Sequence, residues 1–524
     1  MINRDKNPKD RHLSVLNTKE KQVYERFIII VAILVIICLV YTEFSLFELF
    51  ENGHYFWEFI TVDFFPPSMP DIKDTLVTIG ITIAMAVSAT TVGGILAIFV
   101  SLFGSEYISP FKKSAKIVRG FATFLRNIPT LVWAFILFSS LGIGTGVGFM
   151  ALVITSFAFM VRAFIETMDE ISSDCVESLE AVGATFWQRV VQGIWTSSIE
   201  GFISWFLYCL EVNIRASTIV GMVGGGGIGM VLLSYLKSFK YHKAAGIILA
   251  VAAMVILVEI LTNALRKWLA GSNKTTTYFL IGTGVVSLLC LFTLDVDWLK
   301  LFSRMPEIPE IFGKLFMFDF EKMDLIIEAF FETVSVAVLS TVFSILLGLL
   351  FGMFAANNIF RIRFMPICVK SFFSFLRAVP TLVWVLMMLV CLGFGSAAGI
   401  VGLCIHTTAF FTRSFAQSFE DVSVDTIEAL EAAGAGRLQI FFGAIIPSAL
   451  SQIIAWTGMR FEINFAECAI LGMVGAGGVG FMISNSIQNY EYGTAGVAII
   501  MVFVFAYLIE RVFVYIKKIL ANPQ

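Results

Sequence analysis

Charged residues are scarce in this chain, and their scarcity excludes most classes of soluble protein. Only 14% of the 524 residues are charged and 58% are hydrophobic, whereas an ordinary soluble domain is about 25% charged and about 45–50% apolar. The formal net charge of −3 provides no basic field of the kind that nucleic-acid binding requires. A water-soluble fold of this composition has too little polar surface to cover its apolar residues, so a polytopic membrane protein remains.

Metal ligands and catalytic constellations are also missing. The four histidines are scattered, and the eight cysteines include no Cys-x-x-Cys pair. Several cysteines lie inside apolar runs, where small-residue packing is their expected role. No nucleophile–base or metal constellation recurs along the chain, so a membrane enzyme is not expected.

Long apolar runs are abundant and predict membrane-spanning helices. A helix needs roughly 20 apolar residues to cross the hydrocarbon core, and runs such as 244–265 meet that length. Continuous rather than alternating apolar residues favour helices over barrel strands. Residues 1–26 are polar and are expected to form a cytoplasmic tail, and the run from residue 27 is expected to be an uncleaved first membrane helix.

The chain repeats itself at a constant offset. Residues 124–133 read FLRNIPTLVW and residues 375–384 read FLRAVPTLVW, so the two arginines differ by 377 − 126 = 251. Glu177 and Glu428 differ by the same number. The sequence therefore predicts two tandem copies of one module, 27–272 and 273–524.

Each module is expected to contribute six spans, so the chain is expected to be an all-α membrane protein of about twelve transmembrane helices. Because six is an even number, both copies have the same orientation in the membrane, and the repeats are parallel. The spans are expected near 27–42, 75–103, 121–140, 146–165, 197–222 and 244–266, and near 278–294, 326–354, 372–393, 396–413, 447–472 and 494–515.

Lysine and arginine in the short loops predict that both termini are cytoplasmic. The loop after the second span carries Lys112, Lys113 and Lys116, and its counterpart carries Arg361 and Arg363. Together with the basic N-terminal tail, the module junction and the C-terminal tail, these loops fall on one side. Lys237, Lys240 and Lys243 are exceptions on the opposite side.

One polar segment occurs twice on the predicted cytoplasmic side. Residues 177–190 read ESLEAVGATFWQRV and residues 428–441 read EALEAAGAGRLQIF. Each predicts a short helix, a glycine turn and a second helix. A docking surface for a soluble partner is favoured over a helix lying on the membrane, since membrane-surface helices favour Lys and Arg whereas these segments lead with Glu.

The repeated segment resembles the coupling motif of ABC importer permeases. The second copy carries the following proline at Pro447, whereas the first copy has Thr196 there. In that family the motif forms coupling helices seated in grooves of the ATPase subunits. The resemblance implies that two ATPase subunits contact one copy each, through Glu177, Leu179, Glu180 and Gly183, and through Glu428, Leu430, Glu431 and Gly434.

The pattern R-x-[IV]-P-T-L-V-W, with GMVGGGGIG after the fifth span, resembles more narrowly the permeases of phosphonate ABC importers. This resemblance covers nearly all of both modules. It implies a type I importer fold in the cell membrane, a phosphonate, phosphite, hypophosphite or phosphate as cargo, and an extracytoplasmic substrate-binding protein. ATP and magnesium would be bound by the partner ATPase, with no cofactor in this chain.

Two alternatives remain open. One is an ABC permease for another small solute, such as an amino acid. The other is an ion-coupled secondary transporter that uses the intramembrane acids Glu211 and Glu462, although this alternative does not account for two matched cytoplasmic segments.

Charged residues interrupt the spans at matched positions, which is costly in a membrane. Arg126 and Arg377 lie in the third spans, and Glu211 and Glu462 lie in the fifth. In one interpretation the arginines line the path of an oxyanion, which a guanidinium fork fits well. In the favoured interpretation each arginine neutralises the glutamate of its own copy, because an unpaired buried charge is expensive.

The copies differ in charge at two adjacent positions. Arg215 matches Ala466, whereas Ala216 matches Glu467. We hypothesise that Arg215 and Glu467 pair across the module interface near the pore.

The glycine-rich segments that follow the fifth spans are not phosphate loops, since neither ends in Gly-Lys-Ser/Thr. A pore gate or a tight packing element is favoured, with contacts from backbone amides to an oxyanion as the alternative. The glycines concerned are Gly221, Gly224, Gly226, Gly227, Gly472, Gly475, Gly477 and Gly478.

Three further polar residues lie in the fourth spans. His406 is a lone histidine whose counterpart is Thr155, and a hydrogen bond to a neighbouring helix is favoured over a ligand contact or a proton relay. Arg162 and Arg413 are expected to snorkel to the cytoplasmic surface.

Overall fold

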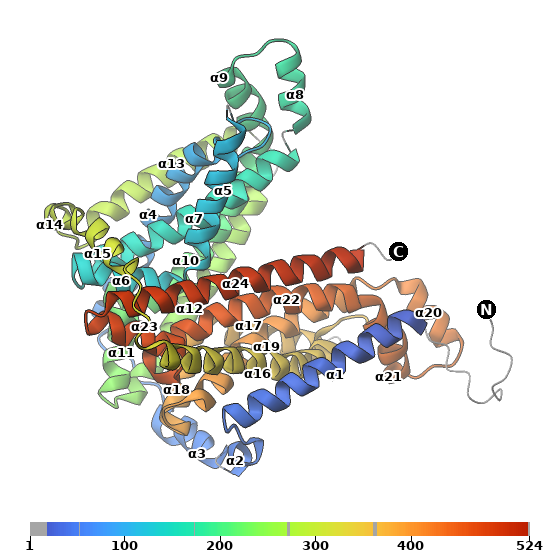
Figure 1. The fold of residues 1–524 in the computed structure, drawn as a ribbon. Helices are drawn as coiled ribbons and strands as arrows, with labels where there is room; N and C mark the ends of the chain where they lie inside the picture. The colour runs from blue at the N-terminus through green and yellow to red at the C-terminus, as the bar shows by residue number, and fades with distance from the viewer. Residues whose placement is uncertain are drawn as a thin grey trace.

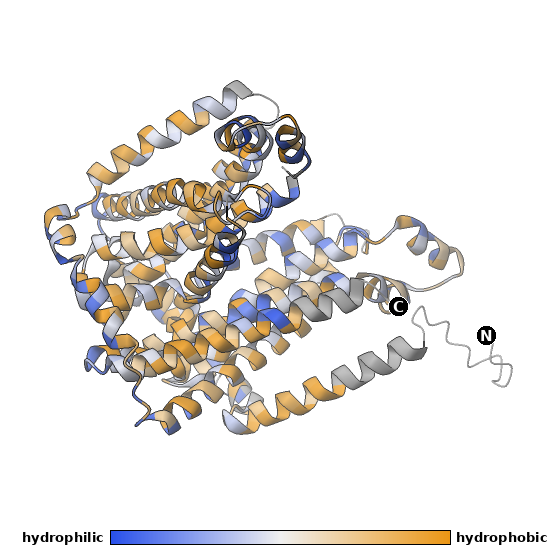
Figure 2. Ribbon diagram, turned by 45° about the horizontal axis from the view of Figure 1, so that its top comes forward, coloured by the Kyte–Doolittle hydropathy of each residue, from blue (hydrophilic) through white to orange (hydrophobic). Residues whose placement is uncertain are grey.

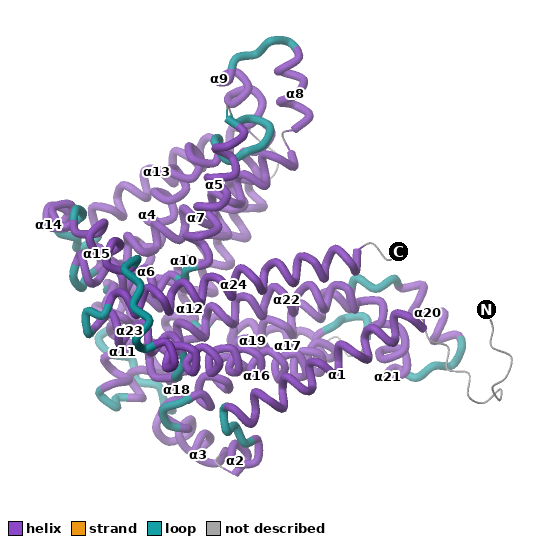
Figure 3. The backbone as a smooth tube through the Cα atoms, viewed as in Figure 1, coloured by secondary structure: helices purple, strands orange, loops and turns teal. Residues whose placement is uncertain are grey.

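The computed structural model describes residues 18–51, 53–109, 111–171, 173–269, 273–359 and 364–521. All regular elements in these ranges are helices (Figure 3). Hydrophobic residues cover most of the long helices, and hydrophilic residues gather in the short helices and connections at their ends (Figure 2). Arg361, Arg363 and most of the N-terminal tail lie outside the described residues.

The helices of the two modules follow one another in the same order. The second set begins 323 − 72 = 251 residues after the first, and the later members keep this spacing to within one residue. The first set is α4 (Ile72–Ser101), α5 (Lys112–Asn127), α6 (Thr130–Leu141), α7 (Thr145–Ile171), α8 (Ser173–Ala181), α9 (Phe186–Gln188), α10 (Trp195–Val220), α11 (Gly227–Lys237) and α12 (Tyr241–Leu269). The second set is α16 (Met323–Ala355), α17 (Phe364–Ala378), α18 (Thr381–Leu392), α19 (Ser396–Glu420), α20 (Val424–Ala432), α21 (Arg437–Ile440), α22 (Ile446–Leu471), α23 (Val479–Gln488) and α24 (Tyr492–Ala521).

The first helix of each module packs on the other module. Helix α1 (Thr18–Tyr41) lies along α16, and α13 (Asn273–Thr293) lies along α4 (Figure 1). The hydroxyl of Tyr41 donates a hydrogen bond to the carbonyl of Glu328 over 3.0 Å. Each lobe of the molecule therefore contains a helix from the opposite half of the sequence.

The third span of each module is a bent pair of helices rather than a single helix. Helices α5 and α6 meet at 87°, and α17 and α18 meet at 85°. The spans predicted near 121–140 and 372–393 therefore each consist of two helices joined at a sharp bend. Pro129 and Pro380 cause the break, because proline lacks an N–H and forces the preceding residue out of the helical region.

The number of spans follows from these bends. Among the described residues, eight helices are long and apolar enough to cross a membrane, or ten if each bent pair forms one span. Helices α1 and α19 occupy the two remaining predicted positions. The apolar part of α1 is short, at Ile29–Tyr41, and α19 carries polar residues that include His406 and Arg413.

The connections between the first and second spans form short helices of their own. The first module has α2 (Leu46–Glu51) and α3 (Gly53–Glu58), and the second has α14 (Trp298–Arg304) and α15 (Glu307–Leu315). The lobes meet at the end where α6, α11, α18 and α23 lie, and they diverge towards α8 and α20 (Figure 1). A single hydrophobic core joins both modules there, with Leu131, Ile228 and Val383 fully buried.

Candidate functional site

The two repeated polar segments form matched hairpins at the diverging ends of the lobes. Helices α8 and α9 lie at the tip of one lobe, and α20 and α21 lie at the tip of the other (Figure 1). Gly183 has φ +83° and Gly434 has φ +81°. The next amide in each copy donates to the carbonyl of Leu179 or Leu430 over 3.0 Å. The glycines end their helices by a left-handed turn, so the predicted helix–glycine–helix structure is confirmed.

The hairpins present carboxylates outward but turn their leucines inward. Glu177, Glu180, Glu428 and Glu431 are exposed, and Glu180 pairs with Arg189 over 3.3 Å. Leu179 and Leu430 are half-buried. The two leucines pack in part on their own modules, and their contacts with a partner stay a prediction.

Other residues provide the exposed apolar surface of the hairpins. Val182 is 79% exposed, Trp187 is 65% exposed and Leu438 is 58% exposed. Trp187 and Leu438 occupy equivalent positions, since 438 − 187 = 251. The recurrence of a large apolar residue at these two hairpin positions is the sequence feature that could have identified Trp187 and Leu438 as candidates for contact with a partner.

Two clusters of ion pairs join the modules. In the Glu510 cluster, Glu510 of α24 contacts Arg126 of α5 over 3.3 Å and Arg162 of α7 over 2.9 Å. Arg126 also lies 3.7 Å from Glu462, and Arg162 lies 3.0 Å from Glu166. The cluster therefore connects α5 and α7 of the first module to α22 and α24 of the second.

The Glu259 cluster is the counterpart on the other side of the interface. Glu259 of α12 contacts Arg377 of α17 over 2.8 Å and Arg413 of α19 over 3.2 Å. Glu211 and Arg215 of α10 pair with each other over 3.2 Å and act electrostatically on Arg377. The residues Arg377, Arg413, Glu211 and Glu259 match Arg126, Arg162, Glu462 and Glu510 at the offset of 251.

These clusters correct two predictions and add two residues that sequence reasoning missed. The glutamates that bind Arg126 and Arg377 come from the opposite module, not from the same copy, because α5 packs on α24 and α17 packs on α12. Glu259 and Glu510 were missed, although both interrupt the sixth spans at matched positions. Arg162 binds a neighbouring helix, so it is held inside the protein rather than snorkelling to the surface.

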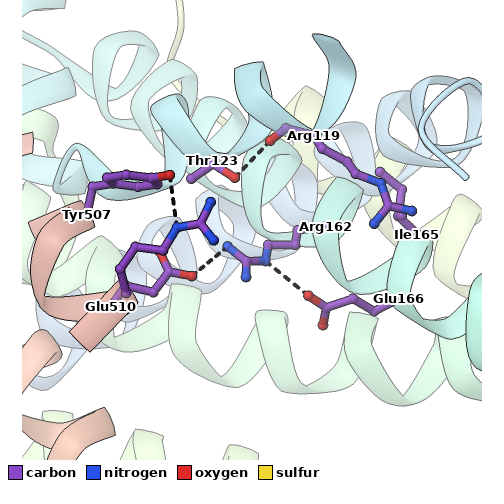
Figure 4. Close-up of a pocket in the computed structure, with 8 residues that line it drawn as sticks. Arg119, Thr123, Arg162, Ile165, Glu166, Tyr507 and Glu510 are labelled. Carbon is purple, nitrogen blue, oxygen red and sulfur yellow. Dashed lines mark hydrogen bonds and ion pairs between the residues drawn. The ribbon is translucent and has the colours of Figure 1, made fainter. Parts of the chain in front are cut away.

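A cavity of about 270 Å³ opens beside the Glu510 cluster. Arg162 reaches between Glu166 and Glu510, and Tyr507 lies on the opposite wall (Figure 4). Arg119 also lines the cavity and pairs with Asp169. The cavity is thus a polar space between the modules, lined by both signs of charge.

The predicted pairing of Arg215 with Glu467 is wrong. Arg215 pairs with Glu211 one turn earlier on α10. Glu467 pairs with Arg460 on α22 over 3.2 Å. Each charge is neutralised within its own helix, because residues four or seven apart lie on the same helical face.

The two glycine-rich segments meet around one cavity. Gly224 and Gly475 have φ values of +111° and +113°, and the next glycines, 226, 227, 477 and 478, also have positive φ. A Cβ at Gly221 would collide with the carbonyl of Gly226, and a Cβ at Gly472 with that of Gly477. Glycine is therefore required for both tight turns.

Residues from both turns line the same cavity of about 870 Å³ at the module interface. Met222 and Val223 lie on one side, and Met473 and Val474 on the other. This position favours the gate interpretation. The backbone amides of Ile228, Gly478 and Val479 donate to Thr82, Glu332 and Thr333, so these donors already have partners and do not support the oxyanion alternative.

The family of the chain follows from a comparison with known proteins. Residues 89–274 and 348–520 match the model of the family described as binding-protein-dependent transport system inner membrane component. The chain belongs to this family of transport permeases. It is thus a multi-pass membrane protein with two copies of the family's domain, and the family's description implies a binding protein as part of the system.

Three relatives show what the permease is similar to within the family. The permease is 27% identical to the phosphate-import permease protein PhnE of Mycolicibacterium smegmatis, with 83% of this chain and 84% of the relative covered. It is 29% identical to the phosphite transport system permease protein PtxC of Stutzerimonas stutzeri, over 38% of this chain and 74% of the relative. It is 32% identical to the putative phosphite transport system permease protein HtxE of the same organism, over 28% of this chain and 57% of the relative.

Two buried asparagines of the permease were missed by sequence reasoning. The side-chain amide of Asn213 donates to the hydroxyls of Thr90 and Ser156. Asn464 donates to the hydroxyl of Thr341 over 2.8 Å and accepts a hydrogen bond from the hydroxyl of Thr407 over 2.9 Å. Each asparagine ties three helices of one module together, and the signal was its recurrence at 464 − 213 = 251.

His406 of the permease is almost completely buried in α19, with 8% of its surface exposed. The ring forms a hydrogen bond with the backbone of Val379 at the break between α17 and α18, which agrees with the predicted bond to a neighbouring helix. Its Nδ1 has no partner among the described residues. Arg460, Arg215 and Arg377 lie close enough to act electrostatically on the imidazole. His406 therefore belongs to the same region as the Glu259 cluster.

Proposed function

We propose that the permease is the membrane subunit of an ATP-driven importer of a phosphorus oxyanion, that is phosphonate, phosphite, hypophosphite or phosphate. The names of the relatives support this class of cargo. The observation that carries the ATP-driven mechanism is the pair of matched hairpins at the diverging ends of the two lobes.

Two ATPase subunits would seat one hairpin each, with both termini of the permease on the same cytoplasmic side. ATP and magnesium would be bound by these subunits, and no cofactor by the permease itself. A substrate-binding protein would deliver the oxyanion on the opposite side, near the cavity formed by the glycine turns. Site residues in the membrane would then line the route between this cavity and the hairpin end.

The hairpins are built to transmit movement. Val176 of α8 and Ile427 of α20 are buried against their own modules, and Leu179 packs close to Gly193 at the start of the fifth span. A push on either hairpin therefore moves a whole lobe rather than a loose loop. Approach of the two hairpins would rock the lobes about the joint core and repack the ion-pair clusters between them.

Reconstitution tests this proposal. The permease, its ATPase and its binding protein are placed in liposomes, and uptake of methylphosphonate, phosphite, phosphate and an amino-acid set is measured with and without ATP. ATP-dependent uptake of a phosphorus oxyanion is expected. Uptake driven by an ion gradient without ATP would refute the proposal, and ATP-dependent uptake of amino acids alone would change the cargo.

The coupling role is tested by changing Glu177→Ala and Glu428→Ala together. These carboxylates are exposed, so the permease should fold normally while uptake and uptake-coupled ATP hydrolysis fall at least about tenfold. Ser178→Ala is the matched control, because Ser178 is exposed on the same helix and its counterpart is Ala429. Equal activity of the double variant and the control would exclude the proposed docking.

A further inference from the structure

Three lysines of the first module depart from the charge pattern of the other loops. Lys237, Lys240 and Lys243 lie at the junction of α11 and α12, and all three are exposed. The amide of Ser68 donates to the carbonyl of His242 in this junction over 2.9 Å, so the junction lies beside the connection of the first two spans, on the side predicted to face away from the cytoplasm. Short loops on that side normally contain few lysines, so their presence indicates a function there.

The second module does not repeat the basic junction. At the offset of 251, the three positions hold Gln488, Glu491 and Thr494. Glu491 is neutralised by Lys322, whose ammonium group lies 2.6 Å from its carboxylate. The three lysines of the first module form no ion pair with any residue that the structure describes. The two junctions are therefore equivalent in fold but differ in charge, and the positive charge of the first is free to act on a mobile anion.

Lys237 reaches the cavity that the glycine turns share. This cavity of about 870 Å³ is lined both by Gly224, just before α11, and by Lys237, the last of the 11 residues of α11. A helix of that length spans about 16 Å, so the cavity extends from the glycine turns to the outer junction. Gln488 lines the cavity from the second module, at the position equivalent to Lys237. Among the described residues Lys237 is the one charged residue of a lining that is otherwise mostly apolar.

A single cation in an apolar cavity acts strongly on an anion. Apolar walls lower the effective dielectric constant and so increase the energy of interaction between two charges. A cleft that carries one sign of charge also raises the local concentration of the opposite ion. One acid, Asp63, acts electrostatically on Tyr241 of the lining, but it does not line the cavity itself. The lining therefore favours an anion over a neutral or cationic solute.

We propose that Lys237 is the entry contact for the phosphorus oxyanion, and that its ammonium group receives the anion at the outer end of the cavity after release from the binding protein. This assignment rests on the proposed function and adds to it a residue that contacts the cargo. Lys240 and Lys243 do not line the cavity, and they extend the positive field beyond its mouth. Gln488 leaves the opposite wall neutral, so the anion enters along the first module.

The test uses liposomes that contain the permease and its ATPase, with the binding protein in excess. The probe is radiolabelled phosphate, or methylphosphonate where the wild type does not import phosphate. Lys237→Gln, which copies Gln488, is expected to lower the maximal rate of uptake about fivefold, the effect of one partly exposed charge. The concentration of binding protein that gives half-maximal stimulation of ATP hydrolysis is expected to stay unchanged.

Two variants are the controls for Lys237→Gln. Lys237→Arg keeps the charge and is expected to retain uptake. Lys243→Thr copies Thr494 and is also expected to retain uptake, because the Lys243 ammonium group lies outside the cavity, 5.9 Å from the centre of the Tyr235 ring.

A double variant gives the sharpest test. Lys237→Gln combined with Gln488→Lys moves the cation to the equivalent position on the same cavity, and it is expected to restore at least about half of the lost uptake. Unchanged uptake in Lys237→Gln, an equal loss in Lys243→Thr, or no recovery in the double variant would overturn the entry contact. Weaker stimulation by the binding protein in Lys237→Gln would also overturn it, because the lysines would then form a docking surface for that protein. A wild-type complex that imports no phosphorus oxyanion would refute the proposed function instead.

Discussion

The two modules of the permease share their fold and most of their internal contacts, but they differ in charge at some of the positions where they face each other. The helix order, the hairpin glycines, the buried asparagines and the glycine turns all recur. Some of the differences fall on charged positions near the interface, such as Arg215 against Ala466 and Glu166 against Gln417. A repeated fold therefore keeps its internal contacts, while the surface shared by the copies is free to become asymmetric.

The glycine turns are the feature in which the modules should be most alike. Gly221→Val and Gly472→Val each place a side chain against a backbone carbonyl that has no room to move. In each variant the free energy of unfolding should fall by about 3 kcal/mol or more, which is the upper range for overpacking. Neither variant should give a monodisperse complex in detergent. A difference in thermal stability between the two variants would contradict the equivalence of the turns.

The ion-pair clusters should respond unequally to the same substitution. Glu259→Gln leaves Arg377 and Arg413 without a carboxylate partner among the described residues, whereas Glu510→Gln leaves Arg126 next to Glu462 and Arg162 next to Glu166. The expected cost is about 2–3 kcal/mol for the first variant and about 1 kcal/mol for the second, based on the worth of hydrogen bonds to charged groups. Thermal unfolding of the purified complex measures both, and the reverse order would show that the clusters are paired differently.

Substitution of the hairpin glycines should lower the stability of the two modules equally, and by less than the substitutions above. Gly183→Ala and Gly434→Ala find open space, so their cost is confined to the left-handed backbone, at about 1–2 kcal/mol each. Uptake should fall while the complex stays intact. Gly443→Ala is the control, because Gly443 also has open space but no positive φ, and it should retain full uptake.

The exposed tips should show the smallest effect on stability. Trp187→Ala and Leu438→Ala remove side chains that are 65% and 58% exposed, so the melting temperature should not change. Coupling of ATP hydrolysis to uptake should fall more for Trp187→Ala, since a larger aromatic surface is lost to the partner. Unchanged coupling in both variants would show that these apolar residues face lipid rather than the ATPase.

Local chemistry decided which parts of the fold were predictable. The apolar runs, the offset of 251 and the helix–glycine–helix hairpins are properties of neighbouring residues, and the structure reproduces them. The bends at Pro129 and Pro380 could also have been predicted from the sequence, because proline breaks a helix locally. They were not predicted because the apolar residues continue on both sides of each proline. The inward turn of Leu179 depends on packing against Gly193, which is not a local property.

The sequence by itself determined that the permease is an all-helical membrane protein of two parallel modules, because length, apolarity and repetition act along the chain. Only the tertiary structure decided that α1 and α13 exchange lobes and that Glu259 and Glu510 bind arginines of the opposite module. The physical reason is that a buried charge needs a partner from whichever helix lies nearest, and helix neighbours across the interface are set by packing of the whole molecule.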